Sequence, residues 1–131
     1  MNAAKIFVNL PVADVARSTS FFTALGFAPR PEYSNDEVAG IAICDGINAL
    51  LVQWELFGTF TNRAVADAAQ VTEVGLALEV ESRERVDEIA DAAIAAGAEK
   101  YEEVDDEVMY SRGFYDLDGH LWHALVMKAP A

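Results

Sequence analysis

The chain has 131 residues, which is enough for one compact domain or two small halves that share a core. Its 22 acidic and 9 basic side chains give a net charge of −13, so it lacks the basic surface that nucleic-acid binders need. With 53% hydrophobic and 24% charged residues it has the composition of a globular protein, and we expect neither a nucleic-acid partner nor a membrane partner.

Cellular location is indicated by cysteine usage and by the first residues. Met1 to Lys5 lead directly into a strand-like run without a signal-peptide pattern, and no apolar run approaches the ~20 residues that span a bilayer. Cys44 is the single cysteine, so an internal disulfide is excluded. We therefore expect a cytoplasmic protein, in which Cys44 is a small core residue of an apolar strand.

The first half of the chain predicts a strand, a helix and three more strands. Residues 5–12 indicate the first strand, and Asp14 can cap a helix over 15–25 that ends at Gly26. Further strands are expected over about 27–33, 37–44 and 47–54. Residues 57–70 predict a connecting segment that contains a short helix.

The second half predicts the same order of elements. A strand over 73–80 precedes Ser82, which can cap a helix over 83–96 that ends at Gly97. Strands are expected over about 99–104, 107–115 and 120–128. Asp45-Gly46 and Asp118-Gly119 predict the tight turn before the last strand of each half.

This order indicates an internal repeat at an offset of 68 residues. The repeat aligns Val8, Leu10 and Val12 with Leu76, Leu78 and Val80, and the cap Asp14 with the cap Ser82. We therefore predict an α+β fold of two βαβββ modules, which form a curved eight-stranded sheet around a cavity with the helices outside. The modules would span about 1–56 and 72–131 of a single domain, 1–131, and residues 57–71 would connect them.

Particular segments resemble those of a known superfamily. They are VNLPVAD at 8–14, RS at 17–18, FF at 21–22, ALGF at 24–27, LALEV at 76–80 and DLDGHLW at 116–122. In these segments the chain resembles the vicinal oxygen chelate superfamily, which includes glyoxalase I, extradiol dioxygenases, fosfomycin-resistance thiol transferases and bleomycin-resistance proteins. The resemblance implies one glyoxalase/bleomycin-resistance-like domain, but not one activity, because this fold hosts many chemistries.

The resemblance also implies where a divalent metal would be held by His, Glu or Gln side chains. Its slots fall on Phe7, Gly75 and His123, and a fourth lies on the strand 47–54 at a position left open. The candidates for that position are Leu51, Gln53 and Glu55. Because phenylalanine and glycine supply no donor atom, at most two ligands remain, where a catalytic site generally needs three. We expect no metal and no other cofactor.

Five residues are candidates for lining the cavity: His123, Gln53, Trp54, Tyr110 and Arg112. His123 would bind a ligand or act as a general base, or it is a hydrogen-bonded core histidine. Arg112 would clamp a carboxylate, or it forms a salt bridge with one of many nearby acids. Trp54, with Phe57 and Phe60, would form an aromatic wall, or these rings simply pack the connecting segment.

These features favour a glyoxalase/bleomycin-resistance-like protein that binds a small organic molecule without a metal. The alternative is a metal-dependent lyase, isomerase or dioxygenase of the glyoxalase type, with His123 as ligand or base. A third reading is a structural dimer with a filled cavity. No residue is identified as catalytic. We expect a homodimer, because the rings of the connecting segment would otherwise be exposed.

Overall fold

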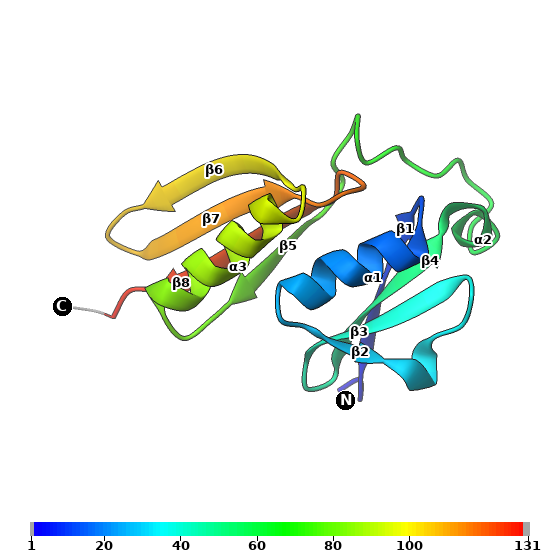
Figure 1. Cartoon of the computed structure of the whole chain (residues 1–131), viewed down its shortest axis with the longest axis horizontal. Helices are drawn as coiled ribbons and strands as arrows, with labels where there is room; N and C mark the ends of the chain where they lie inside the picture. The colour runs from blue at the N-terminus through cyan, green and yellow to red at the C-terminus, as the bar shows by residue number, and fades with distance from the viewer. Residues whose placement is uncertain (1, 130–131) are drawn as a thin grey trace. The chain divides into compact units, whose positions relative to one another are not determined.

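The computed structural model describes residues 2–129. The chain divides into two compact units, Met1–Ala66 and Asp67–Ala131. Each unit has one long helix and one four-stranded sheet (Figure 1). Within residues 2–129 no helix is long and apolar enough to cross a membrane.

The first unit is a mixed four-stranded sheet with α1 packed on it. Its elements are β1 (Ile6–Val12), α1 (Val15–Ala24), β2 (Ala28–Arg30), a 3₁₀ helix (Pro31–Tyr33), β3 (Val38–Cys44), β4 (Ile47–Gln53) and α2 (Trp54–Gly58). The strand order is β1-β4-β3-β2, in which β1 and β4 are parallel and the other neighbours antiparallel. The helix α1 contacts β3 and β4 (Figure 1).

The second unit repeats this arrangement. Its elements are β5 (Gly75–Glu79), α3 (Arg83–Ala95), β6 (Glu99–Asp105), β7 (Met109–Tyr115) and β8 (Leu121–Met127). The strand order is β5-β8-β7-β6, again with one parallel pair, β5 and β8. The predicted α+β class and the two βαβββ modules are thus confirmed. The eight strands form two four-stranded sheets, each with its own hydrogen-bond ladder.

Both long helices begin and end where the sequence predicts. The Asp14 carboxylate accepts the Arg17 amide N–H at 3.0 Å, and the Ser82 hydroxyl accepts the Arg85 amide N–H at 3.1 Å. These bonds satisfy first-turn amides that have no partner within the helix. After each helix a glycine has positive φ, 101° at Gly26 and 108° at Gly97, and so allows the chain to reverse.

Each core lies between the long helix and one face of its sheet. In α1 the buried side chains are Ser18, Phe21 and Phe22, and in α3 they are Val86, Ile89, Ala90 and Ala93. They face alternate strand residues that are also buried, among them Leu10, Ile41 and Leu51 in the first unit and Phe114, Trp122 and Ala124 in the second. The long helix of each unit therefore does not cover the opposite face of its sheet.

Three local predictions are wrong. The strand expected over 27–33 stops at Arg30, because Pro31 has no N–H for the ladder and begins a 3₁₀ turn. The short helix expected within 57–70 starts earlier, at Trp54, where the Gln53 side chain caps it. Cys44 is exposed rather than in the core, because it ends β3 beyond a register shift that follows Ala42.

Candidate functional site

His123 lies on the face of the second sheet that is opposite α3. On β8 it pairs with Gly113 of β7 and Ala77 of β5, so the three residues form a row across the sheet. A methyl group at Gly113 would lie 3.1 Å from the His123 Nε2 atom and 3.1 Å from a Tyr101 ring carbon. The two rings therefore lean over the glycine from either side, and their centroids are 6.2 Å apart.

A second tyrosine extends this aromatic group. The Tyr115 ring lies 5.2 Å from the Tyr101 ring, measured between centroids, and Tyr115 alternates along β7 with the same face as Gly113. We call Tyr101, Gly113, Tyr115 and His123 the His123 face. Small residues continue it on β5, where Gly75 and Ala77 follow the same alternation. The rings of Tyr101, Tyr115 and His123 therefore lie on the same face as Gly75 and Ala77, two positions with little or no side chain.

A cleft of about 460 Å³ adjoins the His123 face at Tyr115. It is lined by residues 68–72, Glu99 and residues 115–119. The backbone around Ala68 approaches the β7–β8 turn so closely that a Cβ at Gly119 would meet the Ala68 carbonyl oxygen at 2.7 Å. Glu99 and Asp118 contribute carboxylates to the cleft, whose wall is therefore acidic.

Asp116 fixes the turn that forms one wall of this cleft. Its carboxylate accepts the Asp118 and His120 amide N–H groups at 3.0 Å each, and the Trp122 indole N–H at 2.9 Å. The side chain is almost fully buried. Burial raises the pKa of Asp116 above its ordinary value, although the nearby His120 and the three hydrogen bonds favour the charged form.

The residues at the implied metal slots do not fit a divalent ion. Gly75 shares the His123 face, so that position and His123 are correctly oriented, but glycine offers no donor. Phe7 packs edge-on against Tyr33, with centroids 5.1 Å apart, and offers none either. No group of three or more His, Cys, Asp or Glu side chains in residues 2–129 is placed to hold a metal.

The strand residues predicted for the fourth slot, Leu51 and Gln53, lie on the face of β4 opposite to the one that pairs with Phe7. Phe7 pairs with Asn48, whereas Leu10 pairs with Leu51 and Val12 with Gln53. Paired residues of neighbouring strands share a face, so Leu51 and Gln53 are opposite Phe7. Glu55 is not in the strand at all, because it belongs to α2. The prediction therefore assigned the alternating residues of β4 to the wrong faces of the sheet, because a shift of one residue exchanges the two faces.

Gln53 and Trp54 meet at the junction of β4 and α2. The Gln53 side chain accepts the Leu56 amide N–H at 3.2 Å and donates to the Glu55 carboxylate. Gln53 therefore acts as a helix cap. The Trp54 side chain is 39% exposed, and nearby the Phe57 and Phe60 rings contact each other with centroids 5.9 Å apart. All of these residues belong to the first unit.

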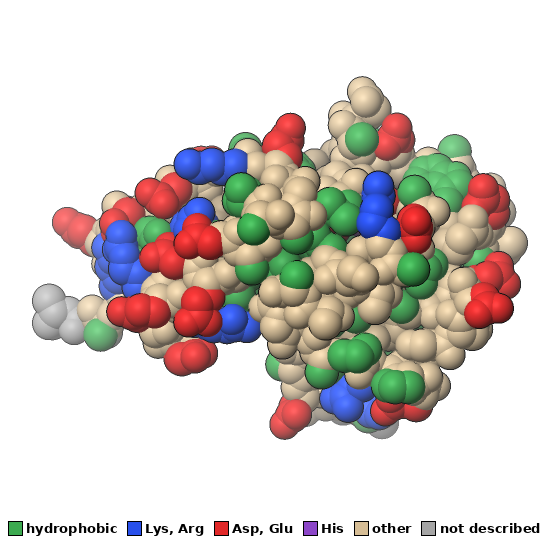
Figure 2. All heavy atoms as spheres, viewed as in Figure 1, with side chains coloured by type: hydrophobic (Ala, Val, Ile, Leu, Met, Phe, Trp, Pro, Cys, Tyr) green, Lys and Arg blue, Asp and Glu red, His purple; other side chains and the backbone are tan. Residues whose placement is uncertain are grey.

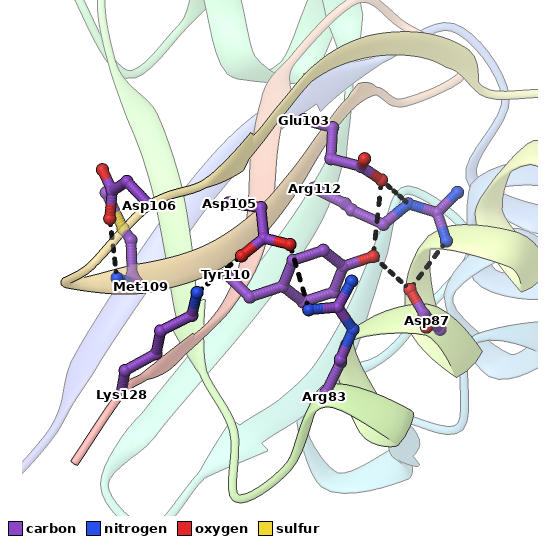
Figure 3. Close-up of polar contacts among 9 residues, drawn as sticks. All are labelled: Arg83, Asp87, Glu103, Asp105, Asp106, Met109, Tyr110, Arg112 and Lys128. Atoms are coloured by element: carbon purple, nitrogen blue, oxygen red, sulfur yellow. Dashed lines mark hydrogen bonds and ion pairs between the residues drawn. The ribbon is translucent and has the colours of Figure 1, made fainter.

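Tyr110 and Arg112 lie on the opposite face of the second sheet from His123. The Tyr110 hydroxyl donates to the Asp87 carboxylate at 2.6 Å, and Arg112 contacts the same carboxylate at 3.1 Å (Figure 3). Arg112 also contacts Asp91 at 2.8 Å. Both acids are in α3, so these bonds join the helix to β7. Arg112 forms the salt bridge that was one of its two predicted roles, and the structure does not bring it or Tyr110 together with His123.

This network continues along the sheet. Arg83 stacks on the Tyr110 ring at 3.8 Å from its centroid, and donates to Asp105 at 3.1 Å. Lys128 bonds the other Asp105 oxygen at 2.6 Å. These cations hold the pKa of Asp105 below its ordinary value, first through the Lys128 hydrogen bond and then through Arg83. Figure 2 shows such acidic and basic side chains next to one another over the second unit.

Asn48 is a residue of interest that the sequence did not indicate. It is 5% exposed, and no hydrogen-bond donor among residues 2–129 reaches its side-chain oxygen. A buried acceptor without a partner costs about 1–3 kcal/mol. An asparagine in an apolar strand is a weak signal by itself, because a strand residue is as often solvated as buried. Asn48 becomes a candidate site residue because it pairs with Phe7 across β1 and β4.

The comparisons with known proteins agree with this architecture. A family model described as bleomycin resistance protein-like N-terminal matches residues 6–33, which include β1, α1 and β2. A hypothetical protein, SA1046, from S. aureus has a solved structure that is similar to this chain, with a TM-score of 0.81 and 26% identity over 96% of this chain and 95% of its own. No curated protein sequence matches the chain significantly.

Two further solved structures carry functional names. A glyoxalase/bleomycin resistance protein/dioxygenase family enzyme from Burkholderia phytofirmans PsJN is similar with a TM-score of 0.77 and 17% identity, over 93% of this chain and 97% of its own. The chain has the fold of the vicinal oxygen chelate superfamily. The fosfomycin resistance protein FosX from Listeria monocytogenes, in complex with Mn(II) and sulfate, is also similar, with a TM-score of 0.71 and 21% identity. The alignment covers 98% of this chain and 93% of FosX. The resemblance inferred from the sequence is thus confirmed at the level of the fold.

Proposed function

We propose that this protein binds a small, partly aromatic organic molecule on the His123 face and in the adjoining cleft, without a resident metal. The single observation that carries the proposal is the packing of the His123 and Tyr101 rings over Gly113. This packing places two aromatic rings, inclined at 70° to each other, beside side chains no larger than a methyl group at Gly75 and Ala77. Sites for small organic ligands are mostly aromatic and apolar, with a few polar groups that set the orientation.

The polar groups of the site favour a neutral or cationic ligand. Glu99 and Asp118 line the cleft, and the whole chain carries a net charge of −13. A cation would gain from the carboxylates and also from the tyrosine faces, through cation–π contact. His123 supplies the remaining polar contact, because its imidazole both donates and accepts hydrogen bonds when neutral. No bond-making step is assigned to it.

The metal-dependent alternative has less support from the residues. FosX is named with Mn(II), but at 21% identity the likeness concerns the fold. In this chain two of the metal slots implied by the resemblance hold Phe7 and Gly75, whose side chains have no lone pair to offer. His123 by itself supplies fewer ligands than a divalent metal site needs. The same fold with different side chains is expected to bind different molecules.

A titration with two molecules of similar shape and opposite charge tests the proposal. 9-Aminoacridine is a planar cation and 9-anthracenecarboxylate is a planar anion. We expect 9-aminoacridine to bind more tightly by at least tenfold, measured by fluorescence, and His123→Ala or Tyr115→Ala to weaken it by a similar factor. The control is Phe60→Ala, which removes an exposed ring in the other unit. Equal binding by all three variants, or preference for the anion, would contradict the proposal.

A further inference from the structure

The face of the first sheet that bears Phe7 holds a covered polar group. Phe7 and Asn48 are paired across β1 and β4, and Tyr33 lies over Gly40 of β3, where an added Cβ would meet the Tyr33 Cβ at 2.9 Å. Gly40 pairs with Leu50, which shares a face of β4 with Asn48. Because β4 lies between β1 and β3, the Phe7 and Tyr33 rings, whose centroids are 5.1 Å apart, meet over the face of β4 that bears Asn48 and Leu50. We call these two rings the roof of this face.

The covered amide is left without the partner that its burial demands. Asn48 is 5% exposed, and its side-chain oxygen has no donor among the described residues. Its neighbours by register, Phe7 and Ala42, have no polar side-chain atoms. The Tyr33 hydroxyl accepts a hydrogen bond from Lys5 at 3.0 Å, toward the edge of the roof. Buried polar groups are nearly always paired, and an exception indicates strain, a functional role or a bound water or ion.

The roof can be opened at modest cost. Phe7 is 38% exposed, and its ring is held by the edge-on contact with Tyr33 rather than by enclosure in the core. A planar molecule that replaces this ring contact with its own keeps the aromatic packing. A carboxamide at the edge of such a molecule matches an asparagine amide, since each offers one acceptor and two donors.

We infer that the Phe7–Tyr33–Asn48 cluster is a recognition site for a planar aromatic molecule with a carboxamide edge, which donates a hydrogen bond to the Asn48 oxygen. This goes beyond the proposed function, because none of these residues belongs to the His123 face. In this site the Phe7 ring supplies a contact surface for an organic molecule, which a metal-ligating side chain at the same position would not supply.

Benzamide and N,N-dimethylbenzamide test the inference by NMR. Both have the aromatic ring and the acceptor, but only benzamide has the N–H donor. We expect saturable shifts of the Asn48 side-chain amide and of the Phe7 ring with benzamide, and at least tenfold weaker binding of the dimethyl compound. Asn48→Leu should abolish these shifts and, because it removes an unpaired buried acceptor, should raise the Tm of the free protein by about 2–8 °C.

Two further variants keep the test decisive. Asn48→Ala must also lose benzamide binding, which covers the case in which leucine does not fit. Asn62→Leu, the same exchange at an exposed position, must keep both the binding and the wild-type Tm. The inference is overturned if benzamide shifts neither residue, if Asn48→Ala binds as the wild type does, or if both benzamides bind equally. Because the readout is on Asn48, failure here is distinct from failure of 9-aminoacridine to bind at His123.

Discussion

The hydroxyl of Tyr110 offers a quantitative test of how α3 is held on its sheet. It donates to the Asp87 carboxylate at 2.6 Å, and Tyr110 is 4% exposed. Burial, followed by the hydrogen bond to Asp87, raises the pKa of Tyr110 to about 12 from an ordinary value near 10. The folded protein therefore retains the proton more strongly than the unfolded chain does. The stability that this retention contributes is complete below pH 10 and is lost as the pH rises through 12.

The magnitude follows from the shift and from the exposure of the partner. Two pKa units correspond to roughly 2.7 kcal/mol, and since the Asp87 side chain is 40% exposed, solvent screening reduces this to about 1–2 kcal/mol. Tyr110→Phe keeps the ring beneath Arg83 and removes only the hydroxyl. We expect it to lower the free energy of unfolding by about 1 kcal/mol at pH 8, and to lack the extra loss that the wild type shows above pH 10.

Urea denaturation followed by circular dichroism between pH 8 and pH 11.5 measures both effects. The matched control is Tyr101→Phe on the other face of the sheet, which should keep the wild-type pH dependence. The reasoning is refuted if Tyr110→Phe loses stability in parallel with the wild type over this range. It is also refuted if the two proteins are equally stable at pH 8.

Three other outcomes are expected. Gly113→Ala should destabilise the protein by about 1–3 kcal/mol, because its Cβ would lie 3.0 Å from the His123 ring. It should also change the NMR ring-current shifts of Tyr101 and His123. Unchanged shifts would contradict the packing of the two rings over Gly113. Asp116→Asn replaces a carboxylate whose ionisation is disfavoured by burial with a neutral amide that still offers one acceptor oxygen. Because burial raises the pKa of Asp116, its own contribution is complete below pH 3.8 and is lost as the pH rises through the folded value, so urea midpoints of the asparagine variant should lack this slope. Sedimentation equilibrium at micromolar concentration should give the mass of a homodimer, and the mass of one chain would rule the dimer out.

The elements with strong local signals were predictable from the sequence. Asp14 and Ser82 as caps, and Gly26 and Gly97 as stops, fix both long helices, because cap chemistry depends on the nearest few residues. The helix at Trp54 was misplaced because its cap is a glutamine, which the preferred cap residues do not include.

The site was less predictable, because it depends on register. Asn48, beside Phe7, lies an odd number of residues from the expected positions Leu51 and Gln53, so these lie on the other face of β4. Alternation alone does not show which face of the strand is which. Arg112 was ambiguous for a related reason. Its acidic partners Asp87 and Asp91 lie more than twenty residues away in the chain, in a helix whose docking the sequence does not show.

Measurement of bound metal most directly tests the central claim, that the His123 face binds an organic ligand rather than a metal ion. The protein is dialysed against Ni²⁺, Zn²⁺ or Mn²⁺ at pH 7.5, and bound metal is measured for the wild type, Gly75→His and Gly75→His/His123→Ala. An added Cβ at Gly75 meets the Leu121 side chain at 3.4 and 3.8 Å, which is ordinary contact, and this position is on the same face as His123. The account predicts no stoichiometric metal in the wild type. Because Gly75→His adds a second imidazole but no third ligand, it predicts weak Ni²⁺ or Zn²⁺ binding in that variant and its loss in the double variant. Stoichiometric metal in the wild type that disappears in His123→Ala would contradict it.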